Sequence, residues 1–473
     1  MSVRAGSEPR NMTTKLLGCQ TDDGSEAKRI DVAVDQVALT SPKEPELLAS
    51  LDTLERSPEL DLVVAYDPFG VRDRQAYRPE ADWQESLRRL GILRGRPGIG
   101  FPSSVHLERF GAPGRILVTD DPRMALLGGI GVLPLITTTA RVLETITTGR
   151  FPWTLPRVVQ ILLSGRLNAT VSARDVCLEL LRRGLKAQIQ ALSSSSKAEV
   201  VLEFTGTGLR GLTVHERAML CSIAPDVGAA AAITGSDEKT ELYLRDQRRS
   251  KAQRQLTPDA GCACDEVVRV ELGSIEPLVQ MPDGQICSLS EREYPAVHEV
   301  ILGGEVSGTL RDMLCAAQWF KSKRAHLEID LVIVPATRQT LEAMVADGTL
   351  SQLLSAGARL LPPDPRLFDG EWQSLANGTN SLRSFTQTST VHSSVLPWAL
   401  ASVETLCQTA ISGRMQDPRL LRRSTKVTCP RELPIDDTWL FERKPSVAPP
   451  PMPAKEPKAK KDAVQDWLDA SAS

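Results

Sequence analysis

The segment RDVCLELLRRG (residues 174–184) and the run EVVLEF (199–204) that follows it decide the fold class. In the first, apolar residues recur at helical spacing and a glycine closes the pattern, which predicts a helix that ends near Gly184. The second is short and rich in β-branched residues, as is typical of a buried strand. The polar stretch ALSSSSK (191–197) between them is predicted to be a loop. A helix and a strand in succession indicate an α/β protein.

The same alternation continues on both sides of this segment. Residues 61–65, 115–118 and 327–334 predict further buried strands, and residues 308–320 predict a helix that leads into the last of them. Strands that alternate with helices predict layers with mainly parallel sheets. The chain has 473 residues, about three times the ~150 residues of a single domain, so two or three domains are expected.

The two ends differ from the body in composition. Residues 1–28 are polar and without pattern, which predicts a disordered N-terminus. Residues 444–473 begin with KPSVAPPPMPAKEPKAKK and predict a disordered, Pro/Lys-rich tail. Near its end, Val464, Trp467 and Leu468 have a spacing that places three side chains on one face of a helical turn. Such a turn on an extended linker is suited to docking in the groove of a protein partner.

Composition and charge exclude several classes of protein. The 56 Lys and Arg residues against 59 Asp and Glu give a net charge of -3, and aromatic residues make up 4%, so nucleic-acid binding is disfavoured. Residues 245–254 nevertheless form a local basic run. No window approaches the ~18 apolar residues of a membrane helix. Nine scattered cysteines predict a reduced, cytoplasmic compartment.

Short catalytic and metal-binding motifs are not found. Cys262 and Cys264 are separated by one residue rather than two, so they do not predict a zinc site. There is no nucleophile elbow, no Walker A sequence and no complete dinucleotide fingerprint. The histidines form no ligand pattern and stand at His106, His215, His298, His326 and His392. From the residues alone we therefore predict no metal and no cofactor.

Longer blocks, taken in order, carry a resemblance. LPRVVQILLSGRL (155–167), EFTGTGL (203–209), SDEKTELYL (236–244) and ISGRMQDPR (411–419) together resemble the aconitase superfamily, especially the large subunit of bacterial 3-isopropylmalate dehydratase. The resemblance implies an α/β fold with three α/β/α domains around a cleft. It also implies that the swivelling fourth domain of that superfamily is missing.

The resemblance also suggests how the chain divides and what its cleft contains. Residues 29–300 would form the first two domains and residues 301–435 the third. Family members hold a 4Fe–4S cluster through three cysteines, and the open iron acts as a Lewis acid in dehydration. At those three positions this chain has Glu305, Pro365 and Phe368, which implies that no such cluster is bound.

The acid–base residues that the resemblance implies have changed in parallel. Family histidines correspond to Pro68, Ser103 and Arg123. Some polar residues survive as candidates for a remnant site that binds a small carboxylate; they are Asp67, Asp121, Asp226 and Arg383. The second arginine of the family's substrate-binding segment is replaced by Thr388.

Two hypotheses of different classes follow. The first is a catalytically degenerate relative reused as a protein-binding or scaffold component, with the tail as one contact. The alternative is a cluster-independent hydro-lyase or isomerase for a small di- or tricarboxylate, with a separate small subunit. It would use Glu305, Asp121 or Asp226 as acid or base and Arg383 or Arg123 to hold a carboxylate. RNA binding through residues 245–254 is a weaker third hypothesis.

Overall fold

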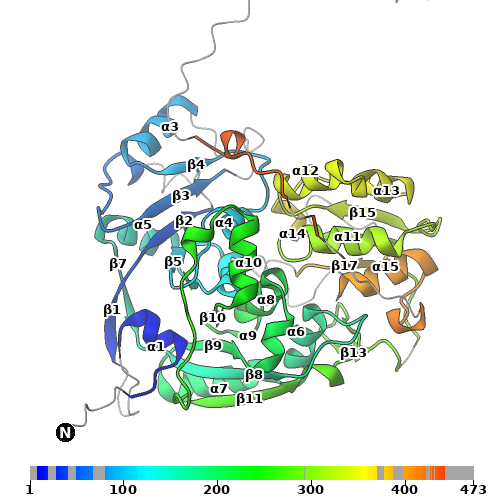
Figure 1. The fold of residues 1–473 in the computed structure, drawn as a ribbon, viewed down its shortest axis with the longest axis horizontal. Coiled ribbons are helices and arrows are strands. Elements are labelled where there is room, and N and C mark those ends of the chain that lie inside the picture. The colour runs from blue at the N-terminus through cyan, green and yellow to red at the C-terminus, as the bar shows by residue number, and fades with distance from the viewer. Residues whose placement is uncertain are drawn as a thin grey trace, which may run out of the picture.

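Three sheets and a two-stranded ribbon make up the body of the protein (Figure 1). The computed structural model describes residues 8–19, 28–40, 50–67, 80–291, 293–369, 378–386, 398–421, 427, 429–430 and 432–442. Helices cover the sheets and make the α/β architecture that the sequence predicts. Within the described residues, no helix is long and apolar enough to cross a membrane.

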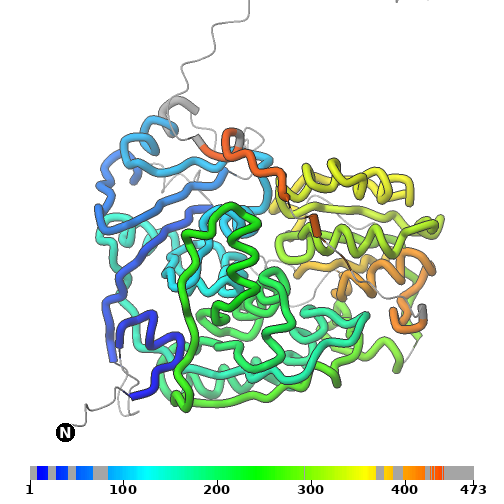
Figure 2. The backbone as a smooth tube through the Cα atoms, in the orientation of Figure 1, coloured from blue at the N-terminus to red at the C-terminus, as the bar shows by residue number. Residues whose placement is uncertain are grey.

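The first sheet has the strand order β19-β4-β3-β2-β5-β6. Its five parallel strands are β2 (Gln36–Leu39), β3 (Leu62–Tyr66), β4 (Leu93–Gly95), β5 (Ile116–Thr119) and β6 (Leu133–Ile136). Its helices are α3 (Glu80–Arg89), α4 (Pro102–Arg109) and α5 (Thr139–Thr148), with the 3-10 helix η2 at Pro122–Ile130. The ribbon beside it pairs β1 (Arg29–Ala33) with β7 (Arg150–Thr154). Figure 2 shows the orange-red end of the described chain crossing to this sheet, where β19 (Phe441–Glu442) pairs with β4.

The second sheet is entirely parallel, in the order β10-β9-β8-β11. The strands are β8 (Arg157–Ser164), β9 (Val200–Thr205), β10 (Ala231–Thr234) and β11 (Glu266–Glu271). The helices between them are α6 (Ala173–Arg182), α7 (Leu185–Ser196), α8 (Val214–Cys221), α9 (Ala224–Val227) and α10 (Glu238–Asp246).

The third sheet has the order β13-β12-β18-β17-β14-β15-β16. Its parallel strands are β14 (Glu299–Gly303), β15 (Asp330–Val334), β16 (Arg359–Leu360), β17 (Ser381–Arg383) and β18 (Ala399–Ala401). Its antiparallel edge is β12 (Leu278–Gln280) and β13 (Ile286–Ser288). The helices are α11 (Leu310–Trp319), α12 (Arg338–Ala346), α13 (Thr349–Ser355), α14 (Arg366–Asp369) and α15 (Val403–Ser412). The third sheet therefore begins before the boundary predicted at residue 300.

Most of the predicted elements are confirmed, and one loop is wrong. The predicted helices are α6 and α11, and the predicted strands are β3, β5, β9 and β15. Residues 191–196, predicted to be a loop, instead complete α7. Their serines tolerate the helix because the hydroxyls of Ser195 and Ser196 donate to the Leu192 carbonyl, at 3.0 and 2.7 Å.

The prediction of a disordered N-terminus is wrong for residues 8–19. They contain helix α1 (Met12–Leu17), and Met12 is fully buried. The carboxylate of Glu203 in β9 accepts hydrogen bonds from the backbone N–H groups of Met12 and Thr13, at 3.2 and 2.7 Å. A buried carboxylate thus satisfies the free donors at the start of the helix. No local pattern signals this partner, because it lies 190 residues away.

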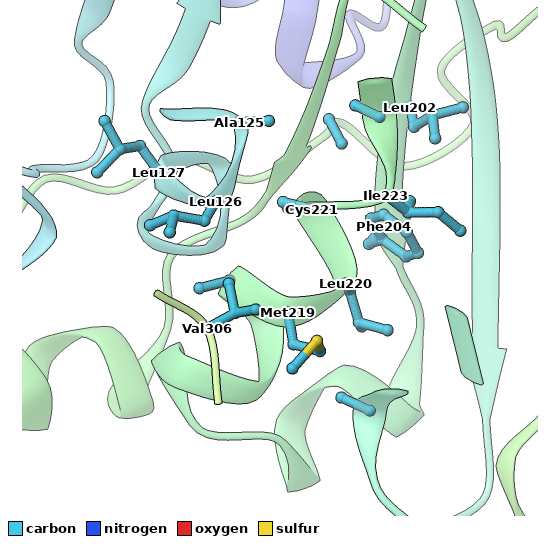
Figure 3. Close-up of a cluster of buried hydrophobic side chains, with 14 of the residues drawn as sticks. Ala125, Leu126, Leu127, Leu202, Phe204, Met219, Leu220, Cys221, Ile223 and Val306 are labelled. Atoms are coloured by element: carbon cyan, nitrogen blue, oxygen red, sulfur yellow. The ribbon is translucent and has the colours of Figure 1, made fainter. Parts of the chain in front are cut away.

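Helix η2 of the first sheet packs directly against the second sheet (Figure 3). Leu126 and Leu127 of η2 share one buried cluster with Leu202 and Phe204 of β9 and with Cys221 of α8. Two glycines of η2 permit this close approach. A Cβ atom at Gly128 would lie 1.8 Å from the Ala232 carbonyl oxygen, and one at Gly129 would lie 2.2 Å from the Ala218 nitrogen.

We expect Gly128→Ala to lower the free energy of unfolding by about 3 kcal/mol, because a methyl group there must push two backbone segments apart. Urea unfolding of the full chain measures the change. The matched control is Gly211→Ala, since no heavy atom lies within 4 Å of its added Cβ. Its expected effect is below about 1 kcal/mol. Equal effects of the two substitutions would contradict this account of the interface.

Candidate functional site

The candidate site lies where the carboxyl ends of parallel strands from the first and third sheets meet. Asp121 follows β5 and Glu305 follows β14. Open α/β sheets place ligand sites at this end of their strands, because the loops that follow the strands are free to carry polar side chains. The Ser104 hydroxyl of α4 donates to the Glu305 carbonyl, at 2.8 Å, and helps to hold the two sheets together here.

An ion pair between Arg123 and Glu305 is at the centre of this site. The Arg123 Nη1 donates to Glu305 Oε1 at 2.7 Å, and the two side chains are only 12% and 6% exposed. Arg123 Nη2 also donates to the Thr386 carbonyl, at 3.2 Å. Charges this deeply buried are stable only when they are paired and hydrogen-bonded. Arg123 therefore connects η2 of the first sheet to two loops of the third.

Aromatic rings fill the space beside the ion pair. The Arg123 guanidinium lies over the Phe368 ring, 3.5 Å from its centroid, in a cation–π arrangement. Phe368 packs on Phe101 with ring centroids 4.9 Å apart and on Phe385 at 5.3 Å. Trp398 continues the cluster, 5.8 Å from Phe385. All four rings are buried, so this part of the contact between the sheets has the character of a protein core.

Asp121 and Asp226 belong to the same electrostatic environment. Burial raises the pKa of Asp121 to about 6, while its bond from the Arg123 N–H and the Arg123 charge oppose the shift. Asp226, in α9, is exposed at its surface, yet desolvation by the protein packed around its carboxyl group raises its pKa. The charges of Arg174 and Arg123 lower the pKa of Asp226, and that of Glu305 raises it. The structure thus brings two of the four predicted remnant residues together with Arg123 and Glu305.

The other two predicted remnant residues form separate ion pairs. Asp67, after β3, pairs with Arg94 of β4 at 3.2 Å, and both side chains are buried. Arg383 is fully buried in β17, where its Nη2 donates to Glu299 Oε1 at 3.0 Å. Its guanidinium also lies 4.1 Å from the Trp398 ring centroid. These contacts explain both residues as parts of the interior, and ligand binding by either stays a prediction.

By resemblance, Glu305 stands at a cysteine position of the family and Arg123 at a histidine position. The sequence does not predict that these two residues form a pair. A signal was available, because two family positions changed together to opposite charges. The aromatic filling by Phe101 and Phe385 had no such signal. It depends on packing between segments more than 250 residues apart.

No alternative set of metal ligands stands out in the described residues. No group of three or more His, Cys, Asp or Glu side chains among them is arranged to hold a metal ion. The nine cysteines are all free. Burial raises the pKa of the Cys177 thiol to about 12 and raises those of Cys221, Cys315 and Cys407, so these thiols remain protonated at neutral pH.

Known proteins match this chain over most of its length. Residues 83–292 match the aconitase family (aconitate hydratase). The 3-isopropylmalate dehydratase large subunit 2 of Archaeoglobus fulgidus is 26% identical over 360 residues, which cover 75% of this chain and 85% of that protein. The large subunit 1 of Methanopyrus kandleri is 24% identical over 434 residues, or 87% of this chain and 99% of that protein.

These matches are consistent with the α/β architecture. The chain is similar to the aconitase superfamily, as the ordered sequence blocks predicted. Within that superfamily it is similar to the large subunits of 3-isopropylmalate dehydratase.

We expect Arg123→Met to lower the free energy of unfolding by about 3 kcal/mol, because it leaves the Glu305 carboxylate buried without its counter-charge. The double variant Arg123→Met/Glu305→Gln should recover at least half of this loss, since neither side chain is then charged. Urea unfolding of the wild type, both single variants and the double variant measures the coupling.

The control for this cycle is a surface pair of similar geometry. Arg338 Nε lies 2.7 Å from Glu342 Oε1, but the side chains are 47% and 38% exposed. Arg338→Met should therefore change the free energy of unfolding by less than about 1 kcal/mol. A double variant at the candidate site that is as unstable as Arg123→Met alone would show that the ion pair is not the source of the effect.

Proposed function

We propose that this protein is an aconitase-like protein that works without a 4Fe–4S cluster and serves as a protein-binding component. The observation that carries the proposal is the Arg123–Glu305 ion pair stacked on Phe368. By resemblance, Glu305 and Phe368 stand at positions where family members have cluster ligands. In this chain the same two positions meet around an arginine.

The donor chemistry at this place does not fit the cluster. Iron–sulfur clusters of this kind are held by thiolates, with few substitutes. The three matching positions offer the Glu305 carboxylate, the Pro365 ring and the Phe368 ring, and two of these have no donor atom. One carboxylate oxygen, Glu305 Oε1, is already bound by Arg123, and the other, Oε2, is buried without a hydrogen bond from the described residues. The ion pair and its aromatic neighbours occupy the space that a cluster would take. The pairing of the two charges makes their burial there stable.

The names of the relatives and the composition of the tail both support a binding role. The matched relatives are named as large subunits, that is, as parts of an assembly. The tail at residues 444–473, with Val464, Trp467 and Leu468, lies outside the described residues. We propose that these three residues form the contact with a protein partner, with Trp467 as the anchor.

Anaerobic reconstitution with iron and sulfide tests the first part of the proposal. The wild-type chain should retain neither iron nor acid-labile sulfide after desalting, because it offers no thiolate at the three positions. The Archaeoglobus fulgidus relative, treated in parallel, is the positive control. Glu305→Cys/Pro365→Cys/Phe368→Cys, combined with Arg123→His, tests whether restoring the donors restores retention.

The alternative hypothesis, a cluster-independent hydro-lyase or isomerase, is tested on the same samples. Hydration of isopropylmaleate or aconitate by the iron-free wild type, lost in Glu305→Ala with the fold retained by circular dichroism, would contradict a purely binding role. Retention of a cluster by the wild type would contradict the proposal of a cluster-free protein.

Truncation tests the contact through the tail. Affinity capture with the full chain and with a chain lacking residues 445–473 should differ by the loss of at least one specific partner. Trp467→Ala should reproduce this loss, since a buried Trp anchor is worth about 2 kcal/mol or more at an interface. Met452→Ala lies in the same tail outside the three-residue motif and is the control. If the truncated chain retains every partner, the tail is not the contact.

A further inference from the structure

Two cysteines that take no part in the charged cleft lie on the loop before β11. Cys262 and Cys264 follow a turn in which the Cys262 N–H donates to the Asp259 carbonyl at 3.2 Å. Both cysteines are partly exposed, and Ala263 between them is exposed. A small molecule in solution can therefore reach this loop. By contrast, five other cysteines are buried; they are Cys177, Cys221, Cys287, Cys315 and Cys407.

The spacing of Cys262 and Cys264 permits a bond between their sulfur atoms. Two residues of extended chain span at most about 7 Å, because each adds no more than ~3.6 Å. Disulfides join Cα atoms that are up to about 6.8 Å apart. The Cys264 thiol already acts as a hydrogen-bond donor to Cys262. Only a modest bend at Ala263 is therefore needed to join the two residues.

The two thiols differ in reactivity. Burial and the Glu203 charge raise the pKa of both, and the pKa of Cys264 reaches about 12. The hydrogen bond from Cys264 opposes this rise at Cys262. Cys262 therefore supplies the thiolate, the form that attacks a disulfide, more readily. The negative charges of Glu203, Asp259 and Asp265 also act on these thiols, so an uncharged reagent approaches them more easily than an anionic one.

The same loop holds helix α1 in place. Asn11, the N-cap residue of α1, donates from Nδ2 to the Ala263 carbonyl at 3.1 Å. The Asp259 carboxylate accepts from the Arg10 N–H at 2.9 Å and from Lys15 Nζ at 2.5 Å. The Ala263 carbonyl belongs to the residue between the two cysteines, so a bend that joins their sulfur atoms turns this carbonyl. The hydrogen bond from Asn11 is then weakened.

We propose that Cys262 and Cys264 are a reversible redox site, in which a neutral low-molecular-weight disulfide joins the two sulfur atoms to one another and thereby loosens α1. The Cys262 thiolate attacks one sulfur of the reagent, which forms a mixed disulfide and releases one thiol. The Cys264 sulfur then attacks the Cys262 sulfur and releases the second thiol. The two protein thiols lose two electrons and two protons, which the reagent takes up as its two thiols. A partly exposed disulfide of this kind is readily reduced again.

Oxidation of the reduced full chain with 2-hydroxyethyl disulfide tests the bond. After removal of the reagent, denaturation and alkylation, trypsin releases residues 255–269, which contain these two cysteines and no other. The peptide should be lighter than its reduced form by two hydrogen atoms and carry no alkyl group. Dithiothreitol before alkylation should reverse the change. A peptide alkylated at both cysteines, or one that carries only adducts of the reagent, would overturn the proposal.

Single variants test the order of the two steps. Cys264→Ser should stop at the mixed disulfide on Cys262, because the second thiol is missing. Cys262→Ser should form its mixed disulfide at least about three-fold more slowly, since the pKa of Cys264 is the more strongly raised. Equal rates in the two variants would overturn the assignment of Cys262 as the attacking thiol.

Amide hydrogen exchange tests the effect on α1. In the oxidised chain, the amides of Met12–Leu17 should exchange about three- to ten-fold faster, which is the loss of one hydrogen bond. The double variant Cys262→Ser/Cys264→Ser, treated with the same reagent, is the control and should keep the protection of the untreated chain. Unchanged exchange in α1 of the oxidised wild type, or equally fast exchange in the treated double variant, would overturn the link between this redox site and the helix.

Discussion

The buried ion pair between Arg123 and Glu305 is the interaction on which the contact between the first and third sheets depends. It connects the first sheet, through η2, with the loop after β14 in the third sheet. Strand ends that converge from two sheets carry free backbone groups and charges into a region with little water. Such a region is stable only if each charge meets its opposite and the remaining volume is filled. Arg123 meets both needs, because its guanidinium bonds to Glu305 and to the Thr386 carbonyl while its face covers Phe368.

Close packing between the sheets surrounds this pair. Close backbone approaches at Gly128 and Gly129 join the first two sheets, and Glu203 fixes helix α1 from the far side of β9. Val306, the residue after Glu305, packs with Met219 in the cluster between these sheets (Figure 3). These contacts between the first two sheets involve neither the Glu305 nor the Phe368 side chain.

Local sequence patterns are sufficient for the α/β fold class and for the similarity to the aconitase superfamily. Helical spacing in residues 174–184 and β-branched runs such as 199–204 are local properties, and they survive in any tertiary context that buries them. The sequence also reveals the unusual residues Glu305, Phe368 and Arg123, because each differs from the residue that the resembled family has at that position. It could not show that they touch, since Arg123 is 182 residues from Glu305 and 245 residues from Phe368.

What these residues do depends on contacts between segments that are far apart in the chain. The fold makes α1 an ordered helix, where the sequence predicts a disordered segment, since the Glu203 carboxylate accepts hydrogen bonds from its free N–H groups. It extended α7 through serines that a local pattern assigns to a loop. It also divided the four surviving polar residues, with Asp121 and Asp226 near Arg123 and with Asp67 and Arg383 in ion pairs of their own. Pairing, burial and cavity volume depend on distances between remote segments, and a linear sequence does not contain those distances.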